Sequence, residues 1–394
     1  MSERTRKDAY GQAIDRAAQG AGDQAEALLR EIDEAAALLG ELLARPAAER
    51  PGLVREVRFH GLKLCQLLQA RSEELWCEDP VAGVELARLA VEISGLLDEA
   101  HYGKGLVEDA QATAWACLGN AYRVASDLRR AEEALDRAEM HLERSGGEAY
   151  TEAQILSFRA SLRSSQGRFR EAANLLDRAL AIYREAKDRH LEGKTLIQKG
   201  VALGYAGQFQ RAIRLLRQGL SRVDPTEEPR LLVSAQHNLV GFLNDSGSPD
   251  QALVTLHKTR RLYRDLGEPS HLARLSWLEG RITRDLGRLD EAEAALKEAR
   301  DFFIHHGIGL DAARVLLDLA TVYAQRGDTA ELKRLAAEMV PIFASRDVHP
   351  EALAALALFQ QAAEAEQVDR GLLERIASSL QALRQAAAHG SGGI

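Results

Sequence analysis

Residues 207–212 read Gly207-Gln-Phe-Gln-Arg-Ala212, and a similar hexapeptide recurs along the chain at an interval of forty residues. The other copies are Gly167-Arg-Phe-Arg-Glu-Ala172, Gly247-Ser-Pro-Asp-Gln-Ala252, Gly287-Arg-Leu-Asp-Glu-Ala292 and Gly327-Asp-Thr-Ala-Glu-Leu332. A fixed period of this length is typical of one helix-turn-helix unit stacked on copies of itself. The repeat therefore predicts a helical solenoid, an architecture that more often supplies an extended surface than a closed reaction chamber.

Within each unit, one helix (helix A) should precede the glycine and a second helix (helix B) should follow it. Around the copy at Gly207, the apolar seam of helix A contains Leu196, Gly200 and Leu203, and that of helix B contains Ala212 and Leu216. Small residues at mid-helix let two helices cross closely while the large ones fill the gap between them. We therefore expect Gly200 to lie where helix A contacts helix B.

An earlier copy carries a more specific pattern, Trp115-x-x-Leu118-Gly119-x-x-Tyr122 followed by Ala131-x-x-x-Leu135-x-x-Ala138. This pattern resembles the tetratricopeptide repeat signature, and the resemblance extends over most of the chain. It implies an all-α fold, a right-handed α-α superhelix (TPR solenoid). About six clear repeats are expected in 112–347, with degenerate helix pairs at 53–98 and 350–388. The forty-residue period exceeds the usual 34 and is similar to the extended repeats of bacterial peptide-sensing regulators and of kinesin light chain.

Three domains are predicted: an N-terminal helical extension (1–52), the solenoid (53–388) and a flexible tail (389–394). The extension contains a short heptad seam, since its apolar residues are spaced by four and three: Leu28, Ile32, Ala35, Leu39 and Leu42. Two heptads are few for a coiled coil, which usually needs three or four. The extension is therefore expected to pack on the first unit, and a homodimer through this helix is the alternative.

Composition and charge restrict the function classes. A net charge of −8 opposes a general nucleic-acid or anionic-membrane binder, because both require a basic footprint. The three cysteines, Cys65, Cys77 and Cys117, show no CxxC spacing, so no disulfide framework or zinc site is indicated. The first residues lack a signal-peptide core and no later stretch is apolar enough to cross a membrane, so a cytoplasmic location is expected.

No motif for catalysis, a cofactor or a metal stands out. Gly193-Lys194-Thr195 has the ending of a phosphate-binding loop, but the position five residues earlier is Asp188 instead of glycine. The eleven histidines show no ligand spacing, and His305-His306 point in different directions on a helix. Acidic pairs such as Glu132-Glu133 are typical of outer helix faces. The chain is therefore expected to be non-enzymatic, with no cofactor and no metal.

The tetratricopeptide resemblance implies that helices A line a concave groove and that recurring positions of each unit face a ligand. Mapped onto this chain, those positions are Asn120, Arg123, Lys194, His237, Asn244, Arg274, Trp277, Arg281, Arg284 and Arg314. Six of them are basic, and only Asp245 and Asp285 oppose them, which gives this face a charge of +4. Such segregation attracts an acidic partner.

One helix carries the densest group, because Arg274, Trp277, Arg281 and Arg284 are spaced by three, four and three. In one interpretation the charges and the indole are exposed and bind a partner's carboxylates and apolar groups. In the other, Trp277 packs between repeats and the arginines pair with carboxylates of the next helix. Asn120 and Asn244 would bind the backbone of an extended peptide.

The leading functional hypothesis is a non-enzymatic adaptor or sensor that holds an acidic peptide or protein segment in the groove. A bacterial peptide-sensing signalling or transcription regulator is the second hypothesis, although residues 1–50 show no compact basic DNA reader. A regulatory subunit of a protease or kinase effector is the third.

Overall fold

The computed structural model describes residues 34–76, 78–226, 228–266 and 269–344, together with short stretches between residues 359 and 376. Within these ranges the regular structure is entirely helical. The chain forms two compact units, which divide after Thr195. Unit 1 holds the described residues up to Thr195, and unit 2 holds those from Leu196 onward.

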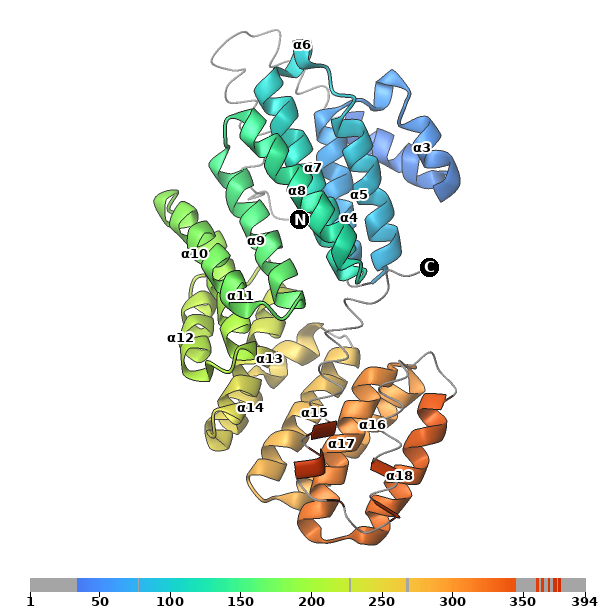
Figure 1. Cartoon of the computed structure of the whole chain (residues 1–394), viewed down its shortest axis with the longest axis vertical. Helices are drawn as coiled ribbons and strands as arrows, with labels where there is room; N and C mark the ends of the chain where they lie inside the picture. The colour runs from blue at the N-terminus through green and yellow to red at the C-terminus, as the bar shows by residue number, and fades with distance from the viewer. Residues whose placement is uncertain are drawn as a thin grey trace. The chain divides into compact units, whose positions relative to one another are not determined.

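Unit 1 opens with helical residues 34–44 and a set of short turns and helices. These are η1 (Ala47–Glu49), α3 (Arg50–Leu53), η2 (Val57–Phe59) and α6 (Glu99–Tyr102). Its longer helices are α4 (Leu62–Leu75), α5 (Pro80–Ser94), α7 (Lys104–Val124), α8 (Leu128–Ser145), α9 (Ala149–Ser165) and α10 (Phe169–Glu185) (Figure 1). Helix α11 (Arg189–Tyr205) crosses the division between the units.

Unit 2 continues with seven further helices of similar length (Figure 1). They are α12 (Phe209–Leu220), α13 (Pro229–Asp245), α14 (Pro249–Leu266), α15 (Pro269–Asp285), α16 (Leu289–His305), α17 (Gly309–Arg326) and α18 (Thr329–Ala344). From α7 onward, odd-numbered helices are helices A and even-numbered helices are helices B. The solenoid prediction is confirmed.

The glycines that recur every forty residues lie at the turn between helix A and helix B. All five periodic glycines adopt the left-handed conformation, with φ between +71° and +79°. A side chain with a Cβ atom rarely adopts this conformation, so glycine recurs there. The turn at Gly207 is closed by backbone hydrogen bonds from Gly207 N to Gly204 O and from Gln208 N to Leu203 O, each 2.9 Å.

A second set of glycines lies at the crossing of helices A and B. A Cβ atom at Gly119 would lie 2.8 Å from Leu135 Cγ, and one at Gly280 would lie 2.6 Å from Leu296 Cγ. At Gly200 the nearest atom would be Leu216 Cγ at 3.0 Å. The expected contact of Gly200 with helix B is therefore confirmed.

We predict that Gly200→Leu will destabilise the protein by ~1–3 kcal/mol, because the added side chain overpacks the crossing of α11 and α12. The control is Gly241→Leu in α13, where no atom lies within 4 Å of an added Cβ. Urea unfolding followed by circular dichroism measures both variants. Equal destabilisation by the two substitutions would show that helix crossing is not the cause.

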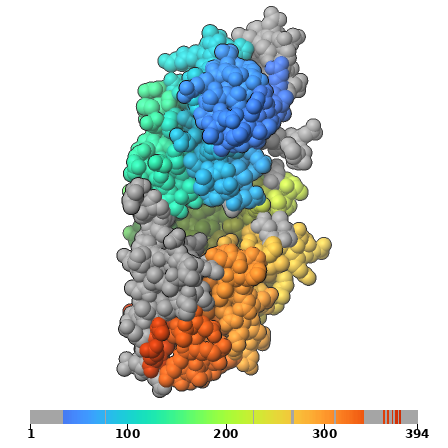
Figure 2. Space-filling view, turned by 90° about the vertical axis from the view of Figure 1, so that its right-hand side faces the viewer, coloured from blue at the N-terminus to red at the C-terminus, as the bar shows by residue number. Residues whose placement is uncertain are grey.

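The described part of the N-terminal extension packs into unit 1. Ala35 and Leu42 are buried and share an apolar cluster with Phe59 and Leu62. Figure 2 shows this first part of the described chain, in blue, lying against the rest of unit 1. The Leu28 and Ile32 end of the predicted heptad seam lies outside the described residues.

The flanking helix pairs differ in how much of them is described. Helices α4 and α5 form the pair expected in 53–98, and Asp79 Oδ1 caps α5 by accepting a hydrogen bond from Ala82 N at 3.0 Å. Most of the pair expected in 350–388, and the predicted tail at 389–394, lie outside the described residues. Phe359 and Ile376 are buried in one apolar cluster with residues of α16, α17 and α18.

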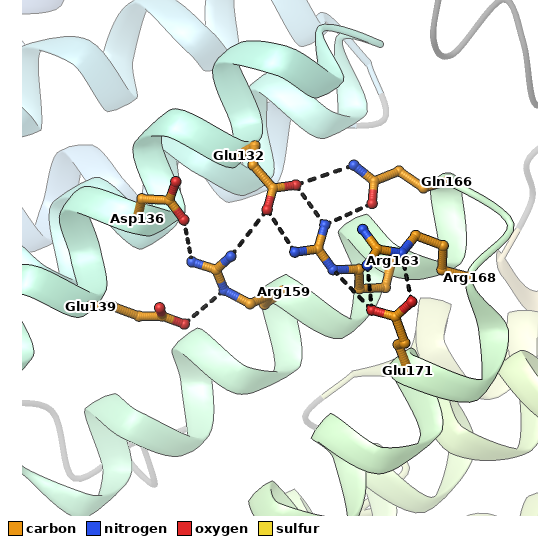
Figure 3. Close-up of polar contacts among 8 residues, drawn as sticks. All are labelled: Glu132, Asp136, Glu139, Arg159, Arg163, Gln166, Arg168 and Glu171. Atoms are coloured by element: carbon orange, nitrogen blue, oxygen red, sulfur yellow. Dashed lines mark hydrogen bonds and ion pairs between the residues drawn. The ribbon is translucent and has the colours of Figure 1, made fainter.

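In unit 1 the junction of α8 and α9 is polar (Figure 3). In α9, Arg159 and Arg163 occupy the positions that Leu118 and Tyr122 occupy in α7. Both guanidinium groups reach Glu132 of α8, and Arg163 Nη1 lies 2.6 Å from Glu132 Oε2. Hydrogen bonding from Arg163 holds the pKa of Glu132 below its ordinary value. The interpretation of Glu132 as part of an ordinary outer face was therefore wrong.

Candidate binding face of helices α13, α15 and α17

In unit 2, consecutive helices A contact one another: α13 contacts α15, and α15 contacts α17. We call the side on which their polar residues meet the unit 2 A-helix face. It includes seven of the residues predicted to face a ligand, namely His237, Asn244, Arg274, Trp277, Arg281, Arg284 and Arg314. Their positions on adjacent helices allow them to interact across the repeats.

Helices α13 and α15 are joined by two polar contacts near their C-terminal ends. Arg281 Nη2 lies 2.8 Å from Asp245 Oδ1. Asn244 Nδ2 donates a hydrogen bond to Asp285 Oδ2 at 2.6 Å. Asn244 is buried, and its Oδ1 atom has no hydrogen-bond partner among the described residues. A buried acceptor without a donor is costly, because nothing replaces its lost hydration.

Helices α15 and α17 are joined mainly through Asp318. Its two carboxylate oxygens accept from Trp277 Nε1 at 2.7 Å and from Arg284 Nη1 at 2.5 Å. Farther along the helices, Arg274 Nη2 lies 3.4 Å from Asp311 Oδ2. Burial alone would raise the pKa of Asp318, but the charges of Arg284 and Arg281 outweigh it, so the pKa lies below its ordinary value. Asp318 is thus a stable anion that links the two helices.

The structure decides between the two interpretations of Trp277. Its exposed fraction is 9%, and its ring packs edge-on against Phe303 with centroids 6.1 Å apart. The guanidinium of Arg314 lies over the same ring, 4.7 Å from its centroid. The interpretation of Trp277 as an exposed indole is therefore wrong, and the alternative, in which it packs between repeats, is confirmed by its hydrogen bond to Asp318 and its contact with α16.

The three arginines of α15 differ in accessibility, although all were expected to be available to a partner. The side chain of Arg284 is 13% exposed, against 27% for Arg281 and 45% for Arg274. Arg284 also pairs with Asp285 at 2.9 Å, so two carboxylates surround it. Its expected role as an exposed charge is wrong, and it instead holds the helices together.

The predicted positive charge of this face is also corrected. The predicted charge included Asp245 and Asp285 but left out Asp311 and Asp318 of α17. With these included, four arginines on the unit 2 A-helix face meet four aspartates. The sequence contained an indication of these two carboxylates. Asp311 and Asp318 lie three residues before and four residues after Arg314, a spacing that places all three on one face of the helix.

His237 of α13 lies among cationic groups. Burial lowers the pKa of His237 to about 4, and the charges of Arg274, Arg281, His271 and Arg314 act in the same direction. A neutral imidazole among guanidinium groups accepts or donates hydrogen bonds without adding charge. An anion that bound beside it would favour the protonated ring.

The three remaining predicted residues belong to unit 1. Asn120 is buried, and its Oδ1 accepts a hydrogen bond from Arg123 Nε at 2.8 Å. Arg123 Nη1 also lies 3.5 Å from Ser165 Oγ in α9. Lys194 is half-buried in α11. Asn120 thus holds Arg123, and its amide is less accessible to a peptide than expected.

Two further searches cover only the described residues. They contain no group of three or more His, Cys, Asp or Glu side chains placed to hold a metal ion. They also contain no helix that is long and apolar enough to cross a membrane.

Comparison with known structures identifies the fold. A Rap protein complexed with competence and sporulation factor is 16% identical, with a TM-score of 0.61 over 83% of this chain and 88% of that one. The apo form of the quorum sensor NprR from B. thuringiensis is 14% identical, with a TM-score of 0.57 over 81% and 94%. Aspartyl phosphate phosphatase F from Bacillus subtilis is 15% identical, with a TM-score of 0.56 over 88% and 96%.

At the level of sequence, no curated protein matches the chain. The family described as tetratricopeptide repeat matches residues 151–223 and 231–305. These segments contain the helix pairs from α9 to α12 and from α13 to α16. Residues 151–223 and 231–305 are therefore tetratricopeptide repeats, and they lie in a chain with an all-α solenoid fold.

Proposed function

We propose that this protein is a non-enzymatic adaptor or sensor whose unit 2 A-helix face binds an extended, acidic segment of a partner protein or peptide. The observation that carries the proposal is the row of Arg–Asp contacts across α13, α15 and α17. Arg274 and Arg281 take part in it and still retain exposed fractions of 45% and 27%. Of the three arginines of α15, they are the two that a ligand reaches most readily.

The balanced charge of this face defines how an acidic ligand would bind. A guanidinium has five N–H donors, so an arginine paired with one aspartate can still accept a second carboxylate. Arg274 is the better candidate, since its contact with Asp311 is long at 3.4 Å and its side chain is the more exposed. A ligand carboxylate would add to this pair or replace Asp311 at it.

A neutral group would help to fix the ligand between the charges. Neutral His237 offers a hydrogen bond beside Arg274 and Arg281. This arrangement favours an extended segment, whose backbone groups remain free to bind side chains.

The similar folds agree with peptide binding, although they share only the fold with this chain. One of the Rap structures is a complex with competence and sporulation factor. An NprR structure, 14% identical with a TM-score of 0.53, is a complex with its cognate peptide NprX. We infer peptide or protein binding from this chain's own charge pairs and use these complexes as supporting analogy.

Selection from a random peptide display library tests the proposal. We expect the protein to enrich sequences with Asp or Glu, and we expect Arg274→Glu/Arg281→Glu to weaken the selected peptides more than tenfold. The matched control is Arg144→Glu/Arg170→Glu, which makes the same charge change at exposed positions of α8 and α10. Selected peptides that bind all three proteins equally would refute the proposed site, and enrichment of basic peptides would refute its acidic ligand.

A further inference from the structure

Helices α12 and α14 have an exposed basic face in a protein whose net charge is negative. Helix α12 contains three arginines and no carboxylate, while α14 contains four Lys and Arg residues against two aspartates. Six of these cations are exposed: Arg211, Arg214, Arg217, Lys258, Arg261 and Arg264. Both helices are helices B that pack against α13 (Figure 1).

Most of these cations lack an internal partner. Within the described part of the chain, the side chains of Arg214, Arg217, Lys258 and Arg264 make no hydrogen bond or ion pair. Arg261 lies 3.6 Å from Asp265, and both side chains are strongly exposed. An exposed pair of this kind contributes little. By contrast, each arginine of the unit 2 A-helix face lies close to an aspartate or to the Trp277 ring.

The basic character is local. The next helix B, α16, has five acidic residues against two basic ones, so the sign of the charge reverses within one repeat. Glu293 of α16 is already engaged by Lys297, Arg326 and Tyr323. Solubility alone does not require unpaired charges of one sign on two neighbouring helices B. A local patch of one sign is instead typical of a surface that meets an oppositely charged partner.

An apolar side chain accompanies the cations of α14. Val254 of α14 is 53% exposed, and it precedes Lys258 and Arg261 by four and seven residues, which places the three on one side of the helix. Along each helix, the exposed cations span six residues, a rise of about 9 Å. Each helix therefore presents a short row of cations, and the row on α14 has one apolar contact beside it.

We propose that the exposed face of α12 and α14 is a second docking surface, which binds an acidic amphipathic helix of a partner protein. Carboxylates in a stripe along the helix would pair with the arginine rows, and an apolar residue between them would cover Val254. Five of the six cations are arginines, whose planar forks pair with carboxylates bidentately and which are enriched at protein interfaces. This surface is independent of the peptide site proposed above.

Other polyanions fit this patch less well. Among the described residues of α12 and α14, Val254 is the one large hydrophobic residue that is strongly exposed, so these two helices offer no exposed Phe, Tyr or Trp to stack on bases or to anchor in a bilayer. The net charge of −8 also repels an extended polyanion such as DNA or an anionic membrane. A single helix with a few carboxylates experiences that repulsion less.

The experiment uses a synthetic helical peptide with a stripe of Glu and Leu residues, and a scrambled peptide of the same composition. Fluorescence anisotropy measures their binding to the full-length protein. We expect the striped peptide to bind at least tenfold more tightly than the scrambled one, and Arg214→Glu/Arg217→Glu to abolish that preference. Arg144→Glu/Arg170→Glu, with the same change in net charge, should leave binding within about twofold.

The remaining outcomes separate this proposal from others. Equal binding of both peptides, no binding, or equal losses in the two variants would overturn it. Tighter binding of duplex DNA or of phosphatidylserine vesicles through the same arginines would also overturn it and assign the patch to that ligand. The Arg274→Glu/Arg281→Glu variant should bind the striped peptide normally. If the proposed peptide binding at the unit 2 A-helix face proves wrong, this result is therefore unaffected.

Discussion

Arg284→Glu should destabilise the protein by about 4 kcal/mol, because it replaces a buried partner of two carboxylates with a third negative charge. Arg284 lies 2.5 Å from Asp318 and 2.9 Å from Asp285, and its side chain is 13% exposed. Removing one member of a buried pair leaves the other charge without compensation. Urea unfolding, followed by circular dichroism, gives the free energy of unfolding for the variant and the wild type.

The matched control for that experiment is Arg274→Glu on the same helix. Arg274 is 45% exposed and its contact with Asp311 is 3.4 Å, so we expect a loss below about 1 kcal/mol. Arg284→Lys should fall between the two, since it retains the charge and loses the second hydrogen bond. A similar loss for Arg274→Glu and Arg284→Glu would contradict the distinction between a structural and an accessible arginine.

Lowering the pH from 6.5 to 4 should cost about 3 kcal/mol through His237 alone. In the folded protein the pKa of His237 is about 4, against an ordinary value near 6.5. Above pH 6.5 the ring is neutral in both the folded and the unfolded protein, so it does not contribute to the pH dependence of stability. Below that pH the unfolded chain binds a proton that the folded chain does not, so stability falls until the folded ring also titrates.

The difference between the wild type and His237→Asn isolates this effect. Asp318 and Glu132 also have pKa values below their ordinary values, so they too lose stabilising charge as the pH falls, in both proteins. The free energy of unfolding of the wild type minus that of the variant should decline as the pH falls from 6.5 to 4. Above pH 6.5 this difference should be constant. A constant difference over this range would show that His237 is not held neutral by its surroundings.

The fold was predictable from the sequence because its determinants are local. The left-handed conformation favours glycine, so Gly207 and its four counterparts mark five turns from helix A to helix B, whereas Ser126 adopts this conformation between α7 and α8. Close crossing requires a small residue, so Gly119, Gly200 and Gly280 recur at mid-helix. Both requirements act within one repeat, and a periodic sequence displays them directly.

The candidate site was less predictable because it depends on which helix faces which. The spacing of Arg274, Trp277, Arg281 and Arg284 places them on one face, as the structure confirms for their contacts with adjacent helices. The spacing does not reveal that Asp318 reaches Trp277 and Arg284 from another repeat, forty-one and thirty-four residues away. The accessibility of each arginine follows from those contacts between repeats.

Hydrogen exchange on the full-length protein, with and without a selected acidic peptide, tests whether the ligand binds at the unit 2 A-helix face. We expect slower exchange in 229–245, 269–285 and 309–326, the helices that form this face. Protection confined to unit 1, or to α12 and α14, with no change in these three helices, would contradict it.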